Sequence, residues 1–248
     1  MSERNYVFLH IPRSFGSITR WLLRENLENS KYEKLNVNEP NYFHGEILNF
    51  KYKNDKVNLY LGHVPYALLP VFISKDDFKL ALLMRHPIER VASHINFINR
   101  NPTHFLHKKF KDKSLKQILN MKVINNFQTR YLGFFPKSFN MSNRLTIVQE
   151  FESLKIPDFS IPSLIAYDVI DTEIDFLATS RNFNSFLKDI LEDIGIDTEI
   201  TANDASRNKI ETIKEGTRDL IESNNRFDMV LYRYVMCKEK SHVPIQEK

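Results

Sequence analysis

The sequence predicts an α/β fold with a central, mostly parallel sheet flanked by helices, and two observations support this prediction. First, short apolar runs alternate along the chain with amphipathic stretches of helical periodicity, as strands connected by helices do. Second, the apolar runs end in glycine, proline or charged residues, as buried strands do where they enter loops. With 248 residues, of which 42% are hydrophobic, we expect one domain over residues 1–248.

Three apolar runs are the expected parallel strands. They cover residues 6–9, 56–63 and 78–85, and the third is the most apolar, as in strands buried on both faces. A weaker strand is expected over residues 144–149. The polar stretch 26–58, rich in Asn, Lys and Tyr, predicts loop with short helical pieces up to the second strand.

The clearest helix signal follows the third strand. Pro87 suits the first turn of a helix, and Ile88, Val91, Ala92 and Ile95 then form one apolar stripe. Two prolines between residues 157 and 162 predict a loop-rich passage. The remaining helices are expected at 114–121, 125–132, 183–194, 208–224 and 227–237.

The most informative stretch is the loop that follows the first strand, with the sequence Arg13, Ser14, Phe15, Gly16, Ser17. The glycine permits a turn that other residues resist, and either serine can cap the helix that follows. Free N–H groups and the helix dipole favour an anion there, and Arg13 adds a full positive charge. The stretch therefore predicts an anion site, although an ordinary corner with a surface arginine has the same local pattern.

Polar residues follow all three strands at their carboxyl ends. Besides the Arg13 loop, His63 comes after Gly62 in the second strand, and Arg85 ends the third. In open α/β sheets, ligands bind at the carboxyl ends of the strands. We therefore expect Arg13, His63 and Arg85 to share one site.

Composition limits the kind of protein. The net charge of +4 suits an anionic ligand but is far below that of a nucleic-acid-packaging protein, so no nucleic-acid partner is expected. The single cysteine, Cys237, excludes an internal disulfide and a cysteine-based zinc site, and no metal-ligand cluster is recognisable. No signal peptide precedes the first strand and no apolar run is long enough to span a membrane, which favours a cytoplasmic location.

Two segments resemble the phosphate-binding elements of sulfotransferases that use 3′-phosphoadenosine-5′-phosphosulfate (PAPS). Residues 10–17, His-Ile-Pro-Arg-Ser-Phe-Gly-Ser, resemble the HIPKTGGTS-type loop, which holds the 5′-phosphosulfate. Residues 85–93 resemble the R-x-P-x-x-R-x-x-S element, in which the first Arg and the Ser, here Arg85 and Ser93, hold the 3′-phosphate. Weaker echoes of carbohydrate sulfotransferases are N-x-Q-T-R-x-L at 126–132, N-x-x-D-x-x-L-Y at 225–232 and G-H-x-P-Y at 62–66.

The resemblance implies a P-loop-like three-layer fold and transfer of a sulfuryl group from PAPS to an acceptor hydroxyl, leaving 3′,5′-ADP (PAP). The acceptor would be a small molecule or a glycan. Sulfuryl transfer needs positive charge near the leaving oxygen and a base for the acceptor proton. The resemblance assigns catalysis to Arg13 and His63, and PAPS binding to Arg13, Ser14, Phe15, Gly16, Ser17, Arg85 and Ser93, with no metal.

Three departures from the family pattern keep other functions open. The family usually has Lys at position 13, often Gly at 15 and Ser at 18, where this chain has Arg13, Phe15 and Ile18. A PAP-binding protein without catalysis is therefore one alternative. A P-loop kinase or NTPase is another, but it needs G-x-x-x-x-G-K-[ST], which the chain lacks. The sequence determines neither the acceptor nor the oligomeric state.

Several further residues have a structural and a functional interpretation. His63 can be a structural histidine at a strand end, and Arg85 with Ser93 can belong to a capped helix. Gln128 and Arg130 either line the site or lie on a helix surface. The basic run between residues 104 and 116 is better explained as a solvated face than as an acceptor site. Arg207 and Lys209 are candidates to approach the 3′-phosphate.

Overall fold

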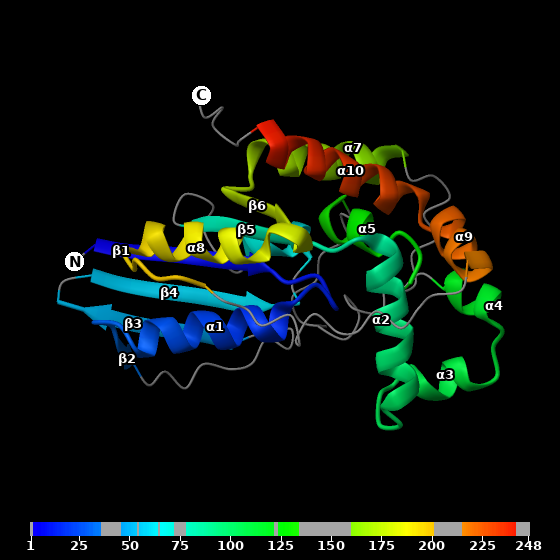
Figure 1. The fold of residues 1–248 in the computed structure, drawn as a ribbon, viewed down its shortest axis with the longest axis horizontal. Helices are drawn as coiled ribbons and strands as arrows, with labels where there is room; N and C mark the ends of the chain where they lie inside the picture. Colours follow the sequence, from blue (N-terminus) through cyan, green and yellow to red (C-terminus); the bar gives the residue numbers. More distant parts are fainter. Residues whose placement is uncertain are drawn as a thin grey trace.

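The structure, a computed structural model, describes residues 2–35, 46–53, 55–63, 65–71, 78–121, 124–133, 160–200 and 215–241. Strands in these ranges form one sheet in the order β2-β3-β4-β1-β5-β6 (Figure 1). The parallel part comprises β1 (Ser2–Leu9), β4 (Asp55–Gly62), β5 (Phe78–Met84) and β6 (Phe176–Thr179). At the other edge, β2 (Glu33–Leu35) and β3 (Glu46–Tyr52) pair antiparallel. The predicted α/β class with a mostly parallel sheet is confirmed.

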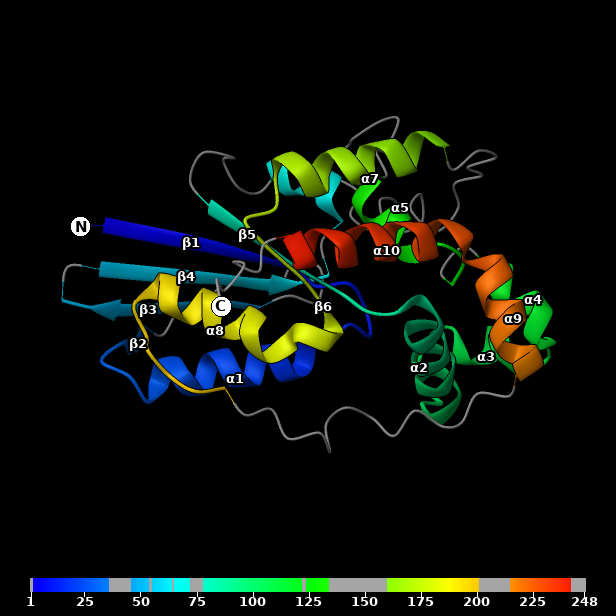
Figure 2. The same ribbon diagram turned by 45° about the horizontal axis from the view of Figure 1, so that its top comes forward.

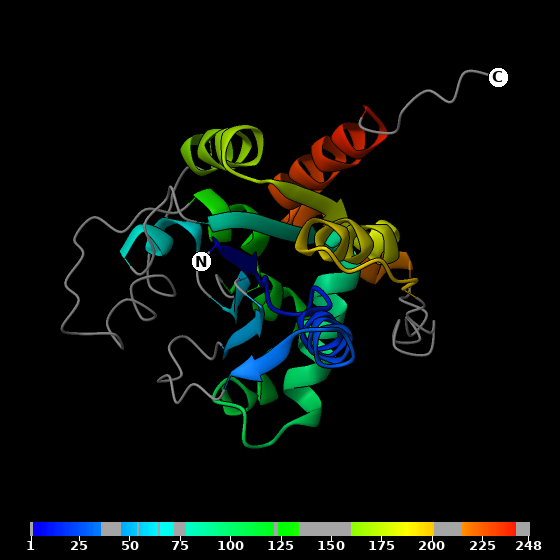
Figure 3. The same cartoon turned by 90° about the vertical axis from the view of Figure 1, so that its left-hand side faces the viewer.

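Helices cover both faces of the sheet, which explains why its central strands are apolar throughout. On β1, Tyr6 and Phe8 face one hydrophobic cluster, whereas Val7 and Leu9 face another. The first cluster is covered by α1 (Gly16–Glu28) and α8 (Phe183–Ile194), which lie together on one face in Figure 3. The second is covered by α5 (Phe127–Gly133), α7 (Ser160–Thr172) and α10 (Arg226–Ser241), grouped in Figure 2.

Beyond the carboxyl ends of the parallel strands, α2 (Pro87–Arg100) begins a small helical group (Figure 1). Its other members are α3 (His107–Lys111), α4 (Leu115–Leu119) and α9 (Glu215–Asn224). The predicted stripe of α2 packs here, with Ile88 and Val91 buried in a third hydrophobic cluster. None of the helices in the described ranges has the length and apolarity needed to cross a membrane.

Local sequence predicted β1, β4, β5 and most of the described helices to within a few residues, and α8 begins and ends as expected. In the described part of 26–58, the expectation of loop with short helical pieces was wrong, because both antiparallel strands lie there. Pro162 does not mark a loop; it lies in the first turn of α7, where a missing N–H costs no intrahelical bond. β6, of four residues, was missed. The strand expected over 144–149 lies outside the described residues.

Candidate functional site

The loop from β1 to α1 contains two residues in the left-handed backbone region, Arg13 (φ 72°) and Phe15 (φ 62°). Such angles cost a non-glycine residue about 1–2 kcal/mol, so neighbouring groups must hold the loop. The Phe15 ring lies 5.4 Å from the Phe183 ring and 5.2 Å from the Arg85 guanidinium. Neither serine caps α1 as predicted, because Phe15 is the N-cap residue and makes no side-chain cap. The first N–H groups of α1 therefore have no partner within the helix.

Gly16 is needed for a close approach and not, as the sequence suggested, for a turn. A Cβ atom at position 16 would lie 1.7 Å from Nε2 of His10, whose ring packs against the start of α1. Burial, followed by the charges of His63 and Arg20, lowers the pKa of His10 to about 3. The His10 imidazole is therefore neutral at physiological pH and acts as a packing surface for the loop.

Replacing Gly16 by alanine should lower stability by about 1–3 kcal/mol, because the new methyl group forces the His10 ring out of place. The additional change His10→Ala should recover much of that loss. Gly216→Ala is the matched control, since a Cβ there meets nothing within 4 Å and alanine favours the helix. Thermal unfolding of these variants tests the contact, and an unchanged melting temperature for Gly16→Ala would contradict it.

Helix α2 presents Ser93 and Phe97 to the Arg13 side chain. The Nε atom of Arg13 donates a hydrogen bond to Ser93 Oγ at 3.1 Å, and the guanidinium lies 4.7 Å from the centre of the Phe97 ring. Sequence reasoning missed Phe97. Its spacing of four residues from Ser93, which places both on one helix face, was the signal that could have found it.

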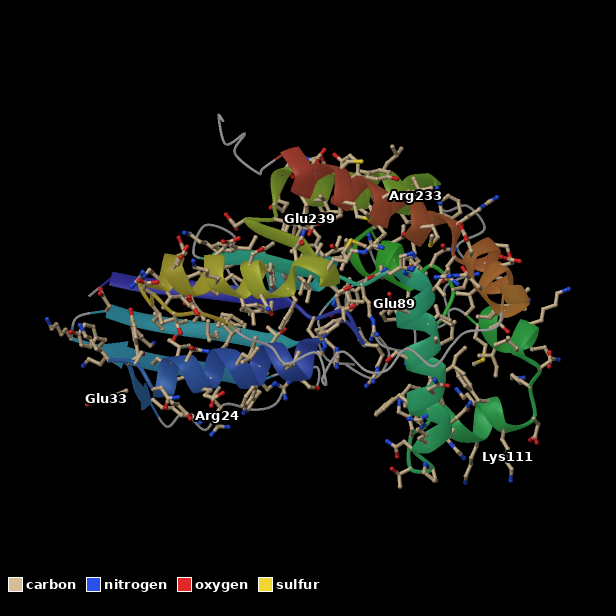
Figure 4. The ribbon with its side chains drawn as sticks, viewed as in Figure 1. Arg24, Glu33, Glu89, Lys111, Arg233 and Glu239 are labelled. Carbon is tan, nitrogen blue, oxygen red and sulfur yellow. The ribbon has the colours of Figure 1, made fainter. Side chains whose placement is uncertain are left out.

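Arg85 joins the same group from the end of β5. Its Nη1 donates to the main-chain oxygen of Arg13 at 3.0 Å, and its side chain is only 6% exposed. Glu89, labelled in Figure 4, is 3.5 Å from Arg85 Nε, whereas no carboxylate in the described ranges pairs with Arg13. Burial lowers the pKa of both arginines, and the charge of Arg85 lowers that of Arg13 further. This excess positive charge at a helix N-terminus favours an anion.

The serines of the site differ from expectation in their partners. Ser93 was expected to act beside Arg85, but it contacts Arg13, which in turn contacts Arg85 through its main chain. Ser14 is 3% exposed and its hydroxyl has no hydrogen-bond partner. A buried hydroxyl without a partner costs about 1–3 kcal/mol, and an anion bound at the loop would offer it an acceptor. The donor set of the loop therefore fits a phosphate or a sulfate ester.

His63 lies beside His10 because β1 and β4 are paired in register up to Leu9 and Gly62. The two imidazole rings are 4.3 Å apart, and Nδ1 of His63 is 3.0 Å from the main-chain oxygen of His10. The Tyr131 hydroxyl donates to the same oxygen at 3.1 Å. Because a carbonyl oxygen only accepts, Nδ1 of neutral His63 carries the proton and Nε2 the lone pair. A general base acting through Nε2 needs this tautomer.

The remaining candidates have different environments. Gln128 and Arg130 are fully buried in α5, so of the two alternatives for these residues the one of an exposed helix surface was wrong. Lys108, Lys109 and Lys111 are exposed, as in a solvated face, and Figure 4 shows Lys111 at the periphery. No metal-binding group of His, Cys, Asp or Glu occurs in the described part of the chain. The residues at 207 and 209 lie outside that part.

Comparison with known proteins adds no assignment to this geometry. No protein-family model matches the chain, and the search of curated proteins finds no match. The functional interpretation therefore rests on the sequence motifs and on the contacts described above.

Proposed function

We propose that the protein is a PAPS-dependent sulfotransferase with a P-loop-like fold, acting on a hydroxyl of a small molecule or a glycan. The observation that carries the proposal is the convergence of the two phosphate-type motifs. Arg13 from the first motif contacts Ser93 and Arg85 from the second, across separations of 80 and 72 residues. Among the described residues, the carboxylate of Glu89 is the one that pairs with these two arginines. The arginines also lie beside the first N–H groups of α1, which have no partner within the helix. This arrangement suits a ligand with several negative charges.

The residues of the chain divide the work of binding. The N–H groups of Phe15, Gly16 and Ser17 would hold the 5′-phosphosulfate, with the Ser14 hydroxyl as a further donor. The 3′-phosphate would be held by Arg85 and Ser93, as the motif resemblance implies. PAPS, when bound, supplies the sulfuryl group.

The chemistry assigned to the chain is charge stabilisation and proton transfer. Arg13 stabilises the negative charge that develops on the leaving phosphate oxygen. His63 accepts the proton of the acceptor hydroxyl at Nε2, and the main-chain oxygen of His10 then holds the resulting imidazolium through Nδ1–H. The buried His10 ring, with its pKa of about 3, stays neutral and does not compete for this proton.

The proposal predicts that 3′,5′-ADP binds about ten- to a hundred-fold more tightly than 5′-AMP, because a charge-assisted contact to phosphate contributes about 1.5–3 kcal/mol. Arg85→Ala should remove most of this preference, because it removes the guanidinium assigned to the 3′-phosphate. Isothermal titration with 3′,5′-ADP, 5′-AMP and ATP measures it. The control is Arg24→Ala, an exposed arginine of α1 that pairs with Glu28.

Equal affinities of the parent for 3′,5′-ADP and 5′-AMP would contradict the proposal. Preference for ATP would favour the kinase or NTPase alternative. Tight binding of 3′,5′-ADP without sulfuryl transfer to any of a panel of glycan and small-molecule alcohols would identify a catalytically inactive PAP-binding protein. The departures at Arg13 and Ile18 are the features that keep this last alternative open.

A further inference from the structure

Gln128 connects helix α5 to the main chain of Arg85. Its Nε2 donates to the Arg85 carbonyl oxygen at 2.9 Å, and its Oε1 accepts from the Arg85 N–H at 3.2 Å. Gln128 has no exposed surface, so water does not compete for either bond. Arg85 lies between the end of β5 and the start of α2 at Pro87, where regular strand hydrogen bonds have ended. The amide side chain replaces them with a two-point attachment.

Gln128 is itself held by a buried carboxylate from α10. Asp228 accepts from the N–H groups of Gln128 and Thr129 at 3.1 and 2.8 Å, and from the Thr129 hydroxyl at 2.8 Å. These N–H groups belong to the first turn of α5, where main-chain N–H groups have no acceptor within the helix. Asp228 thereby caps the helix that carries Gln128. Burial raises the pKa of Asp228, and the nearby charge of Arg90 opposes that shift.

The connection between α5 and α10 is reciprocal. Oδ1 of Asn126, just before α5, accepts from the N–H groups of Phe227 and Asp228 at the start of α10, at 3.0 and 3.2 Å. The N–H of Asn126 donates to Asn225 Oδ1 at 2.9 Å. Each segment therefore caps the helix of the other, about 100 residues away in sequence. The motifs at 126–132 and 225–232 supply the residues of this interlock.

We propose that Gln128 is a positioning residue for anion binding, which acts by fixing the main chain of Arg85 so that its guanidinium reaches the β1–α1 loop. Three contacts of the Arg85 side chain depend on that placement: the hydrogen bond to the Arg13 oxygen, the ion pair with Glu89 and the stacking on Phe15. A rotation of the Arg85 peptide groups moves the guanidinium away from all three. The inference rests on the proposed function only in taking the 3′-phosphate as the anion that Arg85 binds.

A double-mutant cycle separates positioning from general stabilisation. Gln128→Leu should lower the affinity for 3′,5′-ADP about tenfold in the parent, the effect of losing one charge-assisted contact. In an Arg85→Ala background, the same change should leave the affinity unaltered. Thr129→Val is the matched control, because Thr129 is buried in the same helix and bonded to Asp228 without contacting Arg85. Gln128→Glu, which retains an acceptor for the Arg85 N–H, should recover part of the affinity.

Hydrogen exchange of the Arg85 amide gives a second readout that does not depend on the ligand. The exchange should accelerate in Gln128→Leu and not in Thr129→Val, because only the first change removes the acceptor of that N–H. Equal losses of 3′,5′-ADP affinity in both backgrounds, or an unchanged Arg85 exchange rate, would overturn the positioning role. If the parent does not prefer 3′,5′-ADP over 5′-AMP, the proposed function fails, and the exchange experiment still decides whether Gln128 holds Arg85.

Discussion

Replacing His63 by alanine should slow sulfuryl transfer by about 10²–10⁴-fold, because an acceptor hydroxyl is a poor nucleophile until a base accepts its proton. Affinity for 3′,5′-ADP should stay near that of the parent, since the product has no proton to transfer. The measurement is kcat with whichever acceptor alcohol the parent sulfates, beside a titration with 3′,5′-ADP. His107→Ala is the matched control. The Nδ1 atom of His107 also lies against a main-chain oxygen, that of Ile98 at 2.8 Å, but His107 belongs to α3 and not to the candidate site.

The pH dependence of the parent tests the same assignment. A base must be neutral to accept a proton, so the rate should rise with pH as the imidazole of His63 deprotonates. Two other histidines of this region cannot produce that rise. Burial lowers the pKa of His10 and of His94 to about 3, so both stay neutral across the assay range. The rising limb should vanish in His63→Ala and persist in His107→Ala.

Two results would remove His63 from the mechanism. Retained turnover in His63→Ala would show that another group accepts the proton. A large fall in melting temperature would instead indicate a structural role, in which the bond to the His10 oxygen holds the end of β4 against β1.

Replacing Arg13 by alanine should lower kcat by about 10²–10³-fold, the loss typical of one donor that stabilises transition-state charge. Affinity for 3′,5′-ADP should fall much less, because the product lacks the sulfuryl group and the interaction belongs to the transition state. Alanine at position 13 keeps the main-chain oxygen that accepts from Arg85. Its conformational free-energy cost at the left-handed φ of 72° is similar to that of arginine. The change therefore removes the guanidinium while leaving the Arg85 contact available.

Two further variants make the test of Arg13 specific. Arg13→Lys should keep substantial activity, because it restores the residue usual in the resembled family. Arg24→Ala, which removes an exposed arginine from α1, should leave kcat unchanged. Steady-state kinetics at saturating PAPS give the comparison. If Arg13→Ala weakens only the binding of 3′,5′-ADP and turnover at saturation is intact, Arg13 is a binding residue without a catalytic role.

The sequence by itself determined the central strands, the start of α2 and the edge of the sheet at which the candidate site lies. Apolar runs at 6–9, 56–63 and 78–85 indicate buried strands because their periodicity is local, and Pro87 indicates a helix start through its own geometry. The carboxyl ends of parallel strands lie at one edge of the sheet, so the sequence alone was enough to place Arg13, His63 and Arg85 together. β2 and β6, of three and four residues, are too short to show a periodicity. β3 does alternate apolar residues at Leu48, Phe50 and Tyr52, a signal that the sequence analysis missed.

Tertiary structure alone decided which groups of the site touch. Ser93 bonds to Arg13 across 80 residues, and Gln128 holds the Arg85 main chain across 43. The need for glycine at position 16 comes from the His10 ring, and the tautomer of His63 comes from the His10 oxygen. Each is a distance between atoms that the sheet register and helix packing bring together. Hydrophobic periodicity identifies the buried face of an element but contains no information on such distances, so the sequence could name these residues but not their partners.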